Sequence, residues 1–369
     1  MEQIQRESES LSRRDFFTRG TAPLGMSPGM FFSRRKYTVT RSIKALLASA
    51  SVFVSCCALT PSAHAFANGA DVSWVSQEES SGYSFYSNSG VKTDPFVLLK
   101  NIGINAVRLR VWVNPSGGWC NGADVLYKAQ RAAAQGQQIL IDFHYSDTWA
   151  DPGHQTVPAA WSGHTLTQLE SDVYNHTWSI LNYLKTNGIT VTWVQVGNEI
   201  NSGMLWPIGN TSNGFGNLAA LINNGYNAVK SVYPSAGVIL HLANAYDNAD
   251  FRWFFDGVKA AGGKWDIIGM SHYPTASNYT TLDAQAGTNM SDMVSRYGKP
   301  VAIVETGMDW TQVTAANNMI SDMISRVKYL GSNGIGIFYW EPQAYPNWQG
   351  YTWGALNNSG QFTSAISPL

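Results

Sequence analysis

Hydrophobic residues follow two alternating patterns along residues 66–369. Short runs of nearly continuous hydrophobic residues alternate with longer segments in which hydrophobic residues recur every three or four positions. The short runs predict β-strands and the longer segments predict amphipathic helices. Eight strands are predicted, at residues 70–75, 106–113, 138–145, 190–199, 238–244, 265–273, 300–305 and 334–341. Because these runs are hydrophobic almost throughout, we expect parallel strands that are covered on both faces.

The segments between the strands carry helix start and stop signals. Asp94 and Pro95 supply an N-cap and a first-turn proline for a helix that ends before Gly103. Thr165 caps a second helix, which ends at Gly188. Similar patterns predict helices at residues 124–134, 218–232, 251–261 and 315–330.

Eight strand–helix units in about 300 residues predict a single (β/α)8 TIM barrel, an α/β fold. The alternative is a doubly wound open sheet, which usually has fewer strands and often a Gly-rich first turn that this chain lacks. In a (β/α)8 barrel the active site lies at the carboxyl ends of the strands. The residues that end each strand are therefore the candidates for function.

Residues 1–65 have a different character. Basic residues at 34–44 precede an apolar run at 45–60 and the sequence Ala63-His64-Ala65. This order is typical of a secretory signal peptide, so we expect residues 1–65 to be a leader cleaved near Ala65 and residues 66–369 to be the mature domain. The segment at 12–17 (SRRDFF) offers twin-arginine export as an alternative, and Cys56 and Cys57 offer a lipoprotein anchor.

Export predicts a secreted, extracellular protein, with the periplasm as an alternative. The apolar run is shorter than the about 20 residues of a membrane-spanning helix, so we expect no membrane association. Of the 24 Lys and Arg residues nine lie in the leader, and of the 25 Asp and Glu residues four do, which leaves a net charge of 15 − 21 = −6. That charge argues against nucleic acid or an anionic membrane as a partner. We expect a monomer.

Cysteine and tryptophan add two further points. Only Cys120 remains after residue 65, so no internal disulfide is expected. All 14 tryptophans also lie after residue 65. They fit either a large aromatic core or a surface that stacks on the apolar faces of sugar rings, and composition leaves both interpretations open.

Two glutamates end predicted strands. Glu199 ends the fourth strand and Glu305 the seventh, and each follows an apolar run. A lone glutamate at a strand end is more often a capping or salt-bridged residue, but two on opposite sides of one barrel can face each other across its mouth. A retaining glycosidase needs two carboxyl groups about 5–5.5 Å apart, one as nucleophile and one as acid/base.

Several segments together resemble one enzyme family. They are residues 108–115 (RLRVWVNP), 142–155 (DFHYSDTWADPGHQ), 197–201 (GNEIN) with 205–207 (LWP), 271–274 (SHYP) and 338–342 (FYWEP). These segments are similar to those of glycoside hydrolase family 53, the endo-β-1,4-galactanases, which belong to a large clan of barrel glycosidases. The long motif after the third strand is the most specific of them, whereas Asn-Glu alone would indicate only the clan.

The resemblance implies roles for the residues at the mouth. Glu199 resembles the family's acid/base and Glu305 its nucleophile. Asn198 resembles the asparagine that contacts the sugar 2-hydroxyl. Arg108 resembles the arginine that keeps the nucleophile ionised, as an opposite charge lowers a carboxylate pKa; a buried structural ion pair is the alternative.

Three further residues acquire roles from the same resemblance. Tyr273 is expected to hydrogen-bond the nucleophile and Trp340 to stack beneath the sugar at the cleavage point; core packing is the alternative for both. His144 is expected in the mouth, with a scaffold role as its alternative.

No cofactor is expected. His144, Asp147, Asp151 and His154 are close in sequence, but they lack the spacing of a helical zinc site. Some family members hold calcium in a longer loop after strand seven. Here only residues 308–314 separate strand seven from the next helix, so we do not expect this chain to bind calcium.

Three functions remain under consideration. The first is an endo-β-1,4-galactanase that acts on the galactan side chains of pectin and on type I arabinogalactan. The second is another β-glycanase of the clan that cuts mannan, glucan or xylan, against which the motif after strand three argues. The third is a catalytically silent carbohydrate-binding barrel, against which the retention of both glutamates with Arg108 and Asn198 argues.

Overall fold

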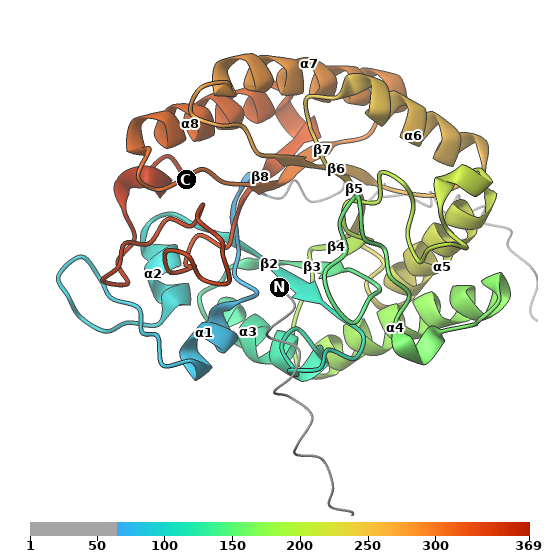
Figure 1. The fold of residues 1–369 in the computed structure, drawn as a ribbon, viewed down its shortest axis with the longest axis horizontal. Coiled ribbons are helices and arrows are strands. Elements are labelled where there is room, and N and C mark those ends of the chain that lie inside the picture. Colours follow the sequence, from blue (N-terminus) through green and yellow to red (C-terminus); the bar gives the residue numbers. More distant parts are fainter. Residues whose placement is uncertain (1–64) are drawn as a thin grey trace, which may run out of the picture. The chain divides into compact units, whose positions relative to one another are not determined.

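A computed structural model describes residues 65–369 of the chain. Eight parallel strands form a closed barrel in chain order, with β8 hydrogen-bonded to β1 (Figure 1). The (β/α)8 barrel expected from the sequence is therefore confirmed. The strands are β1 Ala67–Asp71, β2 Ala106–Val111, β3 Gln138–Phe143, β4 Trp193–Val196, β5 Gly237–Leu242, β6 Ile267–His272, β7 Val301–Thr306 and β8 Gly334–Trp340.

Helices surround the strands (Figure 1). They are α1 Val75–Ser80, α2 Pro95–Asn101, α3 Gly122–Ala134, α4 Leu166–Thr186, α5 Gly216–Val232, α6 Asn248–Ala260, α7 Tyr279–Tyr297 and α8 Val313–Tyr329. Two of them, α1 and α2, lie between β1 and β2, and the only helical turn in residues 341–369 is the short 3-10 segment Ser364–Ile366. Within residues 65–369, no helix combines the length and the apolar character that crossing a membrane requires.

The helix starts follow the signals in the sequence. The Asp94 carboxylate accepts a hydrogen bond from the Phe96 amide at 2.7 Å, and Pro95 is the first residue of α2. Thr165 and Gln168 form a capping box at the start of α4. Both predicted N-termini are confirmed because each cap satisfies amides that have no partner inside the helix.

Three elements differ from the prediction. The first strand lies at 67–71 rather than 70–75, and Val75 begins the short helix α1, which was not predicted. Helix α7 was not predicted, because its buried face includes Asp283, Ala286 and Asn289 and so shows little hydrophobic periodicity.

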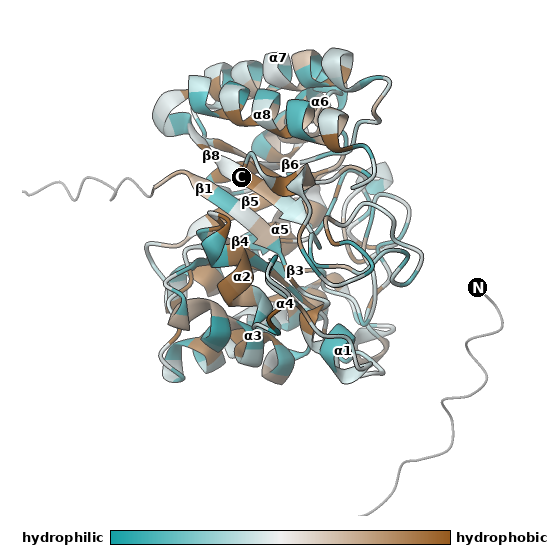
Figure 2. Cartoon of the chain, turned by 90° about the vertical axis from the view of Figure 1, so that its left-hand side faces the viewer, coloured by the Kyte–Doolittle hydropathy of each residue, from teal (hydrophilic) through white to brown (hydrophobic). Residues whose placement is uncertain are grey.

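Apolar side chains fill the barrel interior toward the amino ends of the strands. Trp193 and Phe338 are the bulkiest members of this interior cluster, which also contains residues of the other strands. Gly69 of β1 makes room for them, since a Cβ at this position would lie 2.1 Å from Phe338 Cδ1. A second, larger cluster packs the outer faces of the strands against the helices, and Figure 2 shows the corresponding hydrophobic colouring of the strands and of one side of the helices.

The interior becomes polar toward the carboxyl ends of the strands. Side chains two positions apart point to the same face of a strand. The interior residues Ala106, Leu140, Trp193 and Ile239 are each followed two positions later by a fully buried polar residue: Arg108, Asp142, Gln195 and His241. The same strands thus supply an apolar floor and, above it, a set of polar groups directed at the mouth.

Candidate active site

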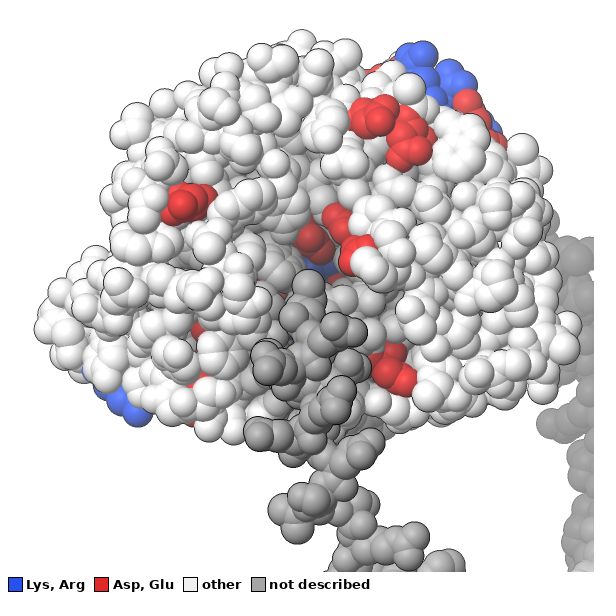
Figure 3. Space-filling model, in the orientation of Figure 1, with Lys and Arg blue, Asp and Glu red and all other residues white. Residues whose placement is uncertain are grey.

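A cavity of about 680 Å³ opens where the strands end. It is lined by Trp74, His144, Trp149, Ala150, Asp151, Asn198, Glu199, Tyr273, Glu305, Trp340, Gln349, Gly350, Tyr351, Thr352 and Trp353. In Figure 3 acidic side chains gather in the central hollow, with basic atoms behind them, whereas most of the surrounding face carries no charge. All seven site residues expected from the sequence except Arg108 line this cavity, and Arg108 lies buried beneath it.

The backbone turns sharply as the chain leaves several strands. Tyr145, Glu199, Asn244 and Glu341 follow β3, β4, β5 and β8, and all four have positive φ angles, 45° for Glu199. Such a conformation costs a non-glycine residue on the order of 1–3 kcal/mol and is found most often at functional sites. The left-handed turn therefore fixes the direction in which Glu199 leaves the strand.

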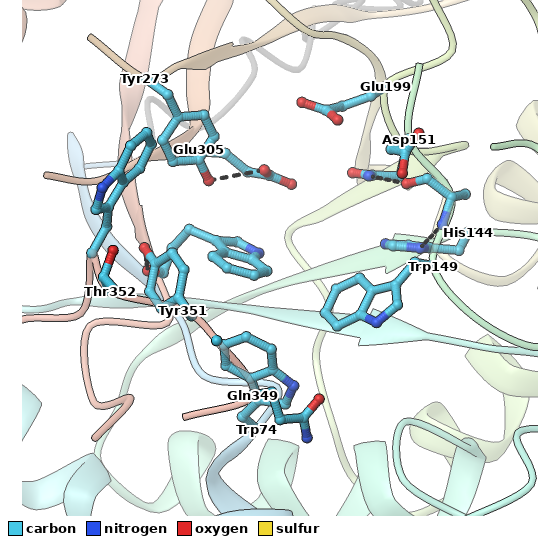
Figure 4. A pocket seen from close by; sticks show the side chains of 15 residues that line it. Trp74, His144, Trp149, Asp151, Glu199, Tyr273, Glu305, Gln349, Tyr351 and Thr352 are labelled. Atoms are coloured by element: carbon cyan, nitrogen blue, oxygen red, sulfur yellow. Dashed lines mark hydrogen bonds between the residues drawn. The ribbon is translucent and has the colours of Figure 1, made fainter. Parts of the chain in front are cut away.

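Glu305 is bound by a cation and a hydroxyl. The Arg108 guanidinium lies 2.8 Å from Glu305 Oε1, and the Tyr273 hydroxyl donates to Oε2 at 3.0 Å (Figure 4). Both contacts expected from the sequence are present. Burial raises the pKa of Glu305, while Arg108 acts in the opposite direction. Two donors directed at one carboxyl stabilise its ionised form.

Arg108 is the centre of a buried charge network. It is fully buried and makes ion pairs with Asp71 at 2.6 Å and Asp142 at 2.9 Å in addition to Glu305. Its Nε donates to Gln195 at 2.7 Å. A buried guanidinium needs such partners to offset the loss of water, and here they also hold it against Glu305.

Glu199 lies on the opposite side of the cavity, and its side chain points toward Glu305 (Figure 4). Its Oε1 accepts a hydrogen bond from the Ser271 hydroxyl at 2.6 Å. Burial raises the pKa of Glu199, and no cation contacts its carboxyl within the described residues. The Arg108 cation therefore favours the negative charge on Glu305, and the proton is left to Glu199.

His144 and Asn198 have their polar atoms occupied by the protein. His144 Nε2 lies 3.0 Å from the Asp142 carboxylate, and its Nδ1 accepts from the Ala150 amide at 3.0 Å. Burial lowers the pKa of His144. Asn198 accepts from Arg108 at 2.8 Å and donates to the Ala150 carbonyl at 2.8 Å. Both side chains therefore support the cavity wall as well as lining it.

An aromatic wall completes the cavity. The Trp340 ring lies 4.9 Å from that of Trp74 and 4.7 Å from that of Tyr351, measured between centroids. The buried guanidinium of Arg110 lies 4.1 Å from the centroid of Trp149, within range of a cation–π interaction. Aromatic faces of this kind suit the apolar faces of sugar rings.

Sequence reasoning did not single out all of these residues. Asp71, Asp142, Gln195, His241 and Ser271 were missed. The last four are polar residues in mainly apolar strands, a signal that could have found them, whereas Asp71 ends a strand of small and polar residues. Trp74, Tyr351 and Trp353 lie outside the strands, where no periodicity marks them.

The described residues do not fit a metal site. Among residues 65–369 no group of three or more His, Cys, Asp and Glu side chains is arranged to hold a metal ion. The connection from β7 to α8, residues 307–312, contains one carboxylate, Asp309, which accepts hydrogen bonds from Thr311. Calcium prefers 6–8 oxygen ligands, so this loop does not suit the ion that some family members hold there.

Sequence comparisons place the chain among known enzymes. Residues 67–369 match the family model described as glycosyl hydrolase family 53. The arabinogalactan endo-β-1,4-galactanase A of Aspergillus niger is 35% identical over 319 residues, which cover 80% of this chain and 89% of the relative. A probable arabinogalactan endo-β-1,4-galactanase A of Neosartorya fischeri is 35% identical over 314 residues, covering 79% of this chain and 88% of the relative.

Solved structures agree with the sequence relatives. A fungal β-1,4-galactanase structure superposes with a TM-score of 0.75 at 34% identity and covers 81% of this chain and 97% of its own. The family 53 catalytic domain of Ignisphaera aggregans gives a TM-score of 0.74 at 28% identity, over 82% of this chain and 95% of that domain. The family match over the whole barrel and the relatives above 30% identity lead to one conclusion: the chain belongs to glycosyl hydrolase family 53.

Proposed function

We propose that this protein is a retaining endo-β-1,4-galactanase in which Glu305 is the nucleophile and Glu199 the acid/base. The observation that carries this assignment is the difference between the two carboxyls. Glu305 faces the Arg108 cation at 2.8 Å, whereas Glu199 has a neutral hydroxyl as its partner. A nucleophile must be ionised and a general acid protonated before the first step, which is the distribution these partners favour.

Two steps follow from this assignment. In the first, a Glu305 oxygen attacks the anomeric carbon while Glu199 transfers its proton to the departing glycosidic oxygen, which leaves a glycosyl ester on Glu305. In the second, Glu199 removes a proton from water, which attacks the anomeric carbon and releases Glu305. As Glu305 loses its negative charge in the first step, Arg108 and the Tyr273 hydroxyl stabilise it again as a leaving group in the second.

The remaining site residues have supporting roles in this proposal. Trp340 stacks beneath the sugar at the cleavage point, Asn198 contacts a sugar hydroxyl through the second N–H of its amide, and His144 holds the wall in place. The substrate assignment rests on the galactanase relatives and on the aromatic lining of the cavity. The proposed substrate is the β-1,4-galactan of pectin or of type I arabinogalactan.

A substrate panel tests the proposal. Reducing-sugar release should be high on β-1,4-galactan and at least about a hundredfold lower on β-mannan, xylan and cellulose, a ratio that differential transition-state binding can supply. Comparable or preferred cleavage of one of the other three would make the protein another β-glycanase of the clan. Absence of cleavage on all four, with retained binding, would make it a silent carbohydrate-binding barrel.

The same reaction reveals its stereochemistry. NMR of the first product from galactan should show the β-anomer before mutarotation, because double displacement inverts the anomeric centre twice. Initial release of the α-anomer would exclude the glycosyl-enzyme intermediate.

We also propose that the enzyme is secreted as a monomer after removal of residues 1–65, which lie outside the described residues apart from Ala65. The order of basic, apolar and small residues supports a leader. N-terminal sequencing of the exported protein should begin at Phe66, and its mass in solution should be that of one chain. An intact leader on the exported protein would contradict the cleavage, and a dimeric mass would contradict the monomer.

A further inference from the structure

A chain of buried hydrogen bonds connects Arg108 with Glu199 and is not used by the two steps above. Arg108 Nε donates to Gln195 Oε1 at 2.7 Å, and Gln195 Nε2 lies 3.1 Å from His241 Nδ1. His241 Nε2 lies 2.7 Å from the Ser271 hydroxyl, which donates to Glu199 Oε1 at 2.6 Å. Gln195 and His241 are fully buried, and Ser271 is nearly so. Strands β2, β4, β5 and β6 thus supply one connected chain behind the acid/base.

The direction of donation along this chain begins at Arg108. A guanidinium can only donate, so the Gln195 carbonyl oxygen must face Arg108. The Gln195 amide group is then left to donate to Asp142 at 2.9 Å and toward His241 Nδ1. The orientation of Gln195 is therefore fixed by the cation at one end and the carboxylate at the other.

His241 receives this donation as a neutral ring. Burial lowers the pKa of His241 well below its ordinary value, and the nearby Arg108 cation acts in the same direction. Its Nδ1 faces two N–H donors, Gln195 Nε2 at 3.1 Å and the Glu199 amide at 3.4 Å. The Asn198 side-chain oxygen, at 2.9 Å, also accepts from Arg108 at 2.8 Å and is the one acceptor that faces Nδ1. Two N–H donors against this one acceptor favour the tautomer of His241 that carries its proton on Nε2.

The Ser271 hydroxyl completes the chain. With a proton on His241 Nε2, the Ser271 oxygen accepts from His241 and its single proton is directed at Glu199 Oε1. Oε1 then already has a donor, so the proton of the neutral carboxyl cannot occupy the same position. Oε2 has no hydrogen-bond partner among the described residues and belongs to a side chain that lines the cavity.

We propose that Ser271 and His241 are positioning residues that assign the acid/base proton to Glu199 Oε2, the oxygen available to the glycosidic bond. This inference rests on the proposed role of Glu199. The two residues do not contact the reacting atoms and act only through the Glu199 carboxyl. In the second step the same arrangement leaves Oε2 as the base that receives a proton from water.

Other groups act on Glu199 as well. The charged and titratable side chains that face it from the surrounding strands and loops are Arg108, Asp142, Asp151, His241, Tyr273 and Glu305. Of these groups, His241 is the one that contacts the Ser271 hydroxyl, at 2.7 Å. Removing that hydroxyl therefore interrupts the link from His241 to Oε1 and leaves the other groups in place.

Aryl β-galactobiosides with graded leaving groups test the proposal. In Ser271→Ala, kcat/KM should fall about tenfold or more with a poor leaving group, which needs the proton, because a hydrogen bond to a charged group contributes about 1.5–3 kcal/mol. The value of kcat/KM should change little with a dinitrophenyl leaving group, which departs without a proton. The basic limb of the pH profile of kcat/KM should move to higher pH, because the lost donor had favoured the carboxylate. Ser271→Thr, which keeps a hydroxyl, should restore both properties in large part.

A matched control removes a buried hydroxyl elsewhere. Thr177 of α4 is fully buried and shares a 2.7 Å hydrogen bond with Tyr145, so Thr177→Val should leave both the leaving-group dependence and the pH profile unchanged. An equal loss for all leaving groups in Ser271→Ala, with an unmoved basic limb, would overturn the proposal. So would ¹⁵N NMR of the histidine-labelled enzyme that places the His241 proton on Nδ1.

Glu199→Ala separates this inference from the proposed function. If Glu199→Ala itself lacks the dependence on the leaving group, then Glu199 is not the acid and the proposed function fails. If Glu199→Ala shows the dependence and Ser271→Ala does not, only the positioning role of Ser271 and His241 fails.

Discussion

At the scale of single residues, the site shows how one residue type can serve two purposes. Glu199 and Glu305 both line the cavity, and burial raises the pKa of each. Their partners differ, because Arg108 and Tyr273 bind Glu305 whereas Ser271 binds Glu199. The chemistry of each carboxyl is therefore set by side chains on other strands, which a motif around the glutamate alone does not contain.

Alanine variants of the two glutamates should be distinguishable. Each should lower the turnover of galactan by about three orders of magnitude or more, because each removes a group needed in both steps. With a dinitrophenyl galactobioside, Glu199→Ala should still form the glycosyl-enzyme, and azide should release it as the β-azide. Azide should instead give the α-azide with Glu305→Ala, because it then attacks the substrate directly. Chromatography and NMR of the two azides check the assignment, and the α-azide from Glu199→Ala would reverse it.

At the scale of elements, the sequence predicted most of the barrel. Seven of the eight strands lie where hydrophobic runs predicted them, and the caps at Asp94 and Thr165 were correctly located. The first strand was displaced because its own residues, ANGAD, are small or polar, whereas the apolar residues that follow lead into α1. That strand is selected by packing inside the barrel, where a small residue is required, and local propensity does not reveal it.

The active site could be predicted only in part. Glu199 and Glu305 were found because each follows an apolar run. The residues behind them, such as Gln195 and His241, are polar positions inside strands whose meaning depends on which strands are neighbours. A closed barrel brings such positions together, and the hydrophobic pattern of one strand carries no information about the next.

Gly69 provides a test of packing at the element scale. A Cβ at residue 69 would lie 2.1 Å from the buried Phe338 ring, so Gly69→Ala should lower the free energy of unfolding by about 1–3 kcal/mol, the usual cost of overpacking. Gly216→Ala at the start of α5 is the matched control, since its Cβ would meet no atom within 4 Å. Urea unfolding of both variants measures the difference. Equal stability of the two variants would show that Phe338 moves aside without cost.

At the scale of the whole molecule, closure of the barrel brings buried acids together from distant parts of the chain. Glu78 lies in α1 and Glu341 directly follows β8, and both are fully buried. Gln343 donates to Glu341 at 2.6 Å and to Glu78 at 3.4 Å. Burial raises the pKa of Glu341 to about 7, and burial together with Glu341 raises that of Glu78 well above its ordinary value. The folded protein therefore retains protons that the unfolded chain releases.

This difference predicts how stability depends on pH. A carboxyl whose pKa is raised by folding contributes stability that is complete below its unfolded pKa and is lost as the pH rises through its folded pKa. Burial lowers the pKa of His176 to about 4. Buried histidines of this kind change the free energy of unfolding only below about pH 6.5, the pKa of a histidine in the unfolded chain. Between pH 6.5 and 8, the free energy of unfolding should therefore fall, by an amount on the order of 1 kcal/mol. In Glu78→Gln, which mimics the protonated side chain, the fall should be smaller, whereas Glu170→Gln on α4 should leave it unchanged. Denaturant unfolding across this pH range measures all three proteins, and parallel curves for Glu78→Gln and the unmodified enzyme would show that Glu78 is already ionised in the folded state.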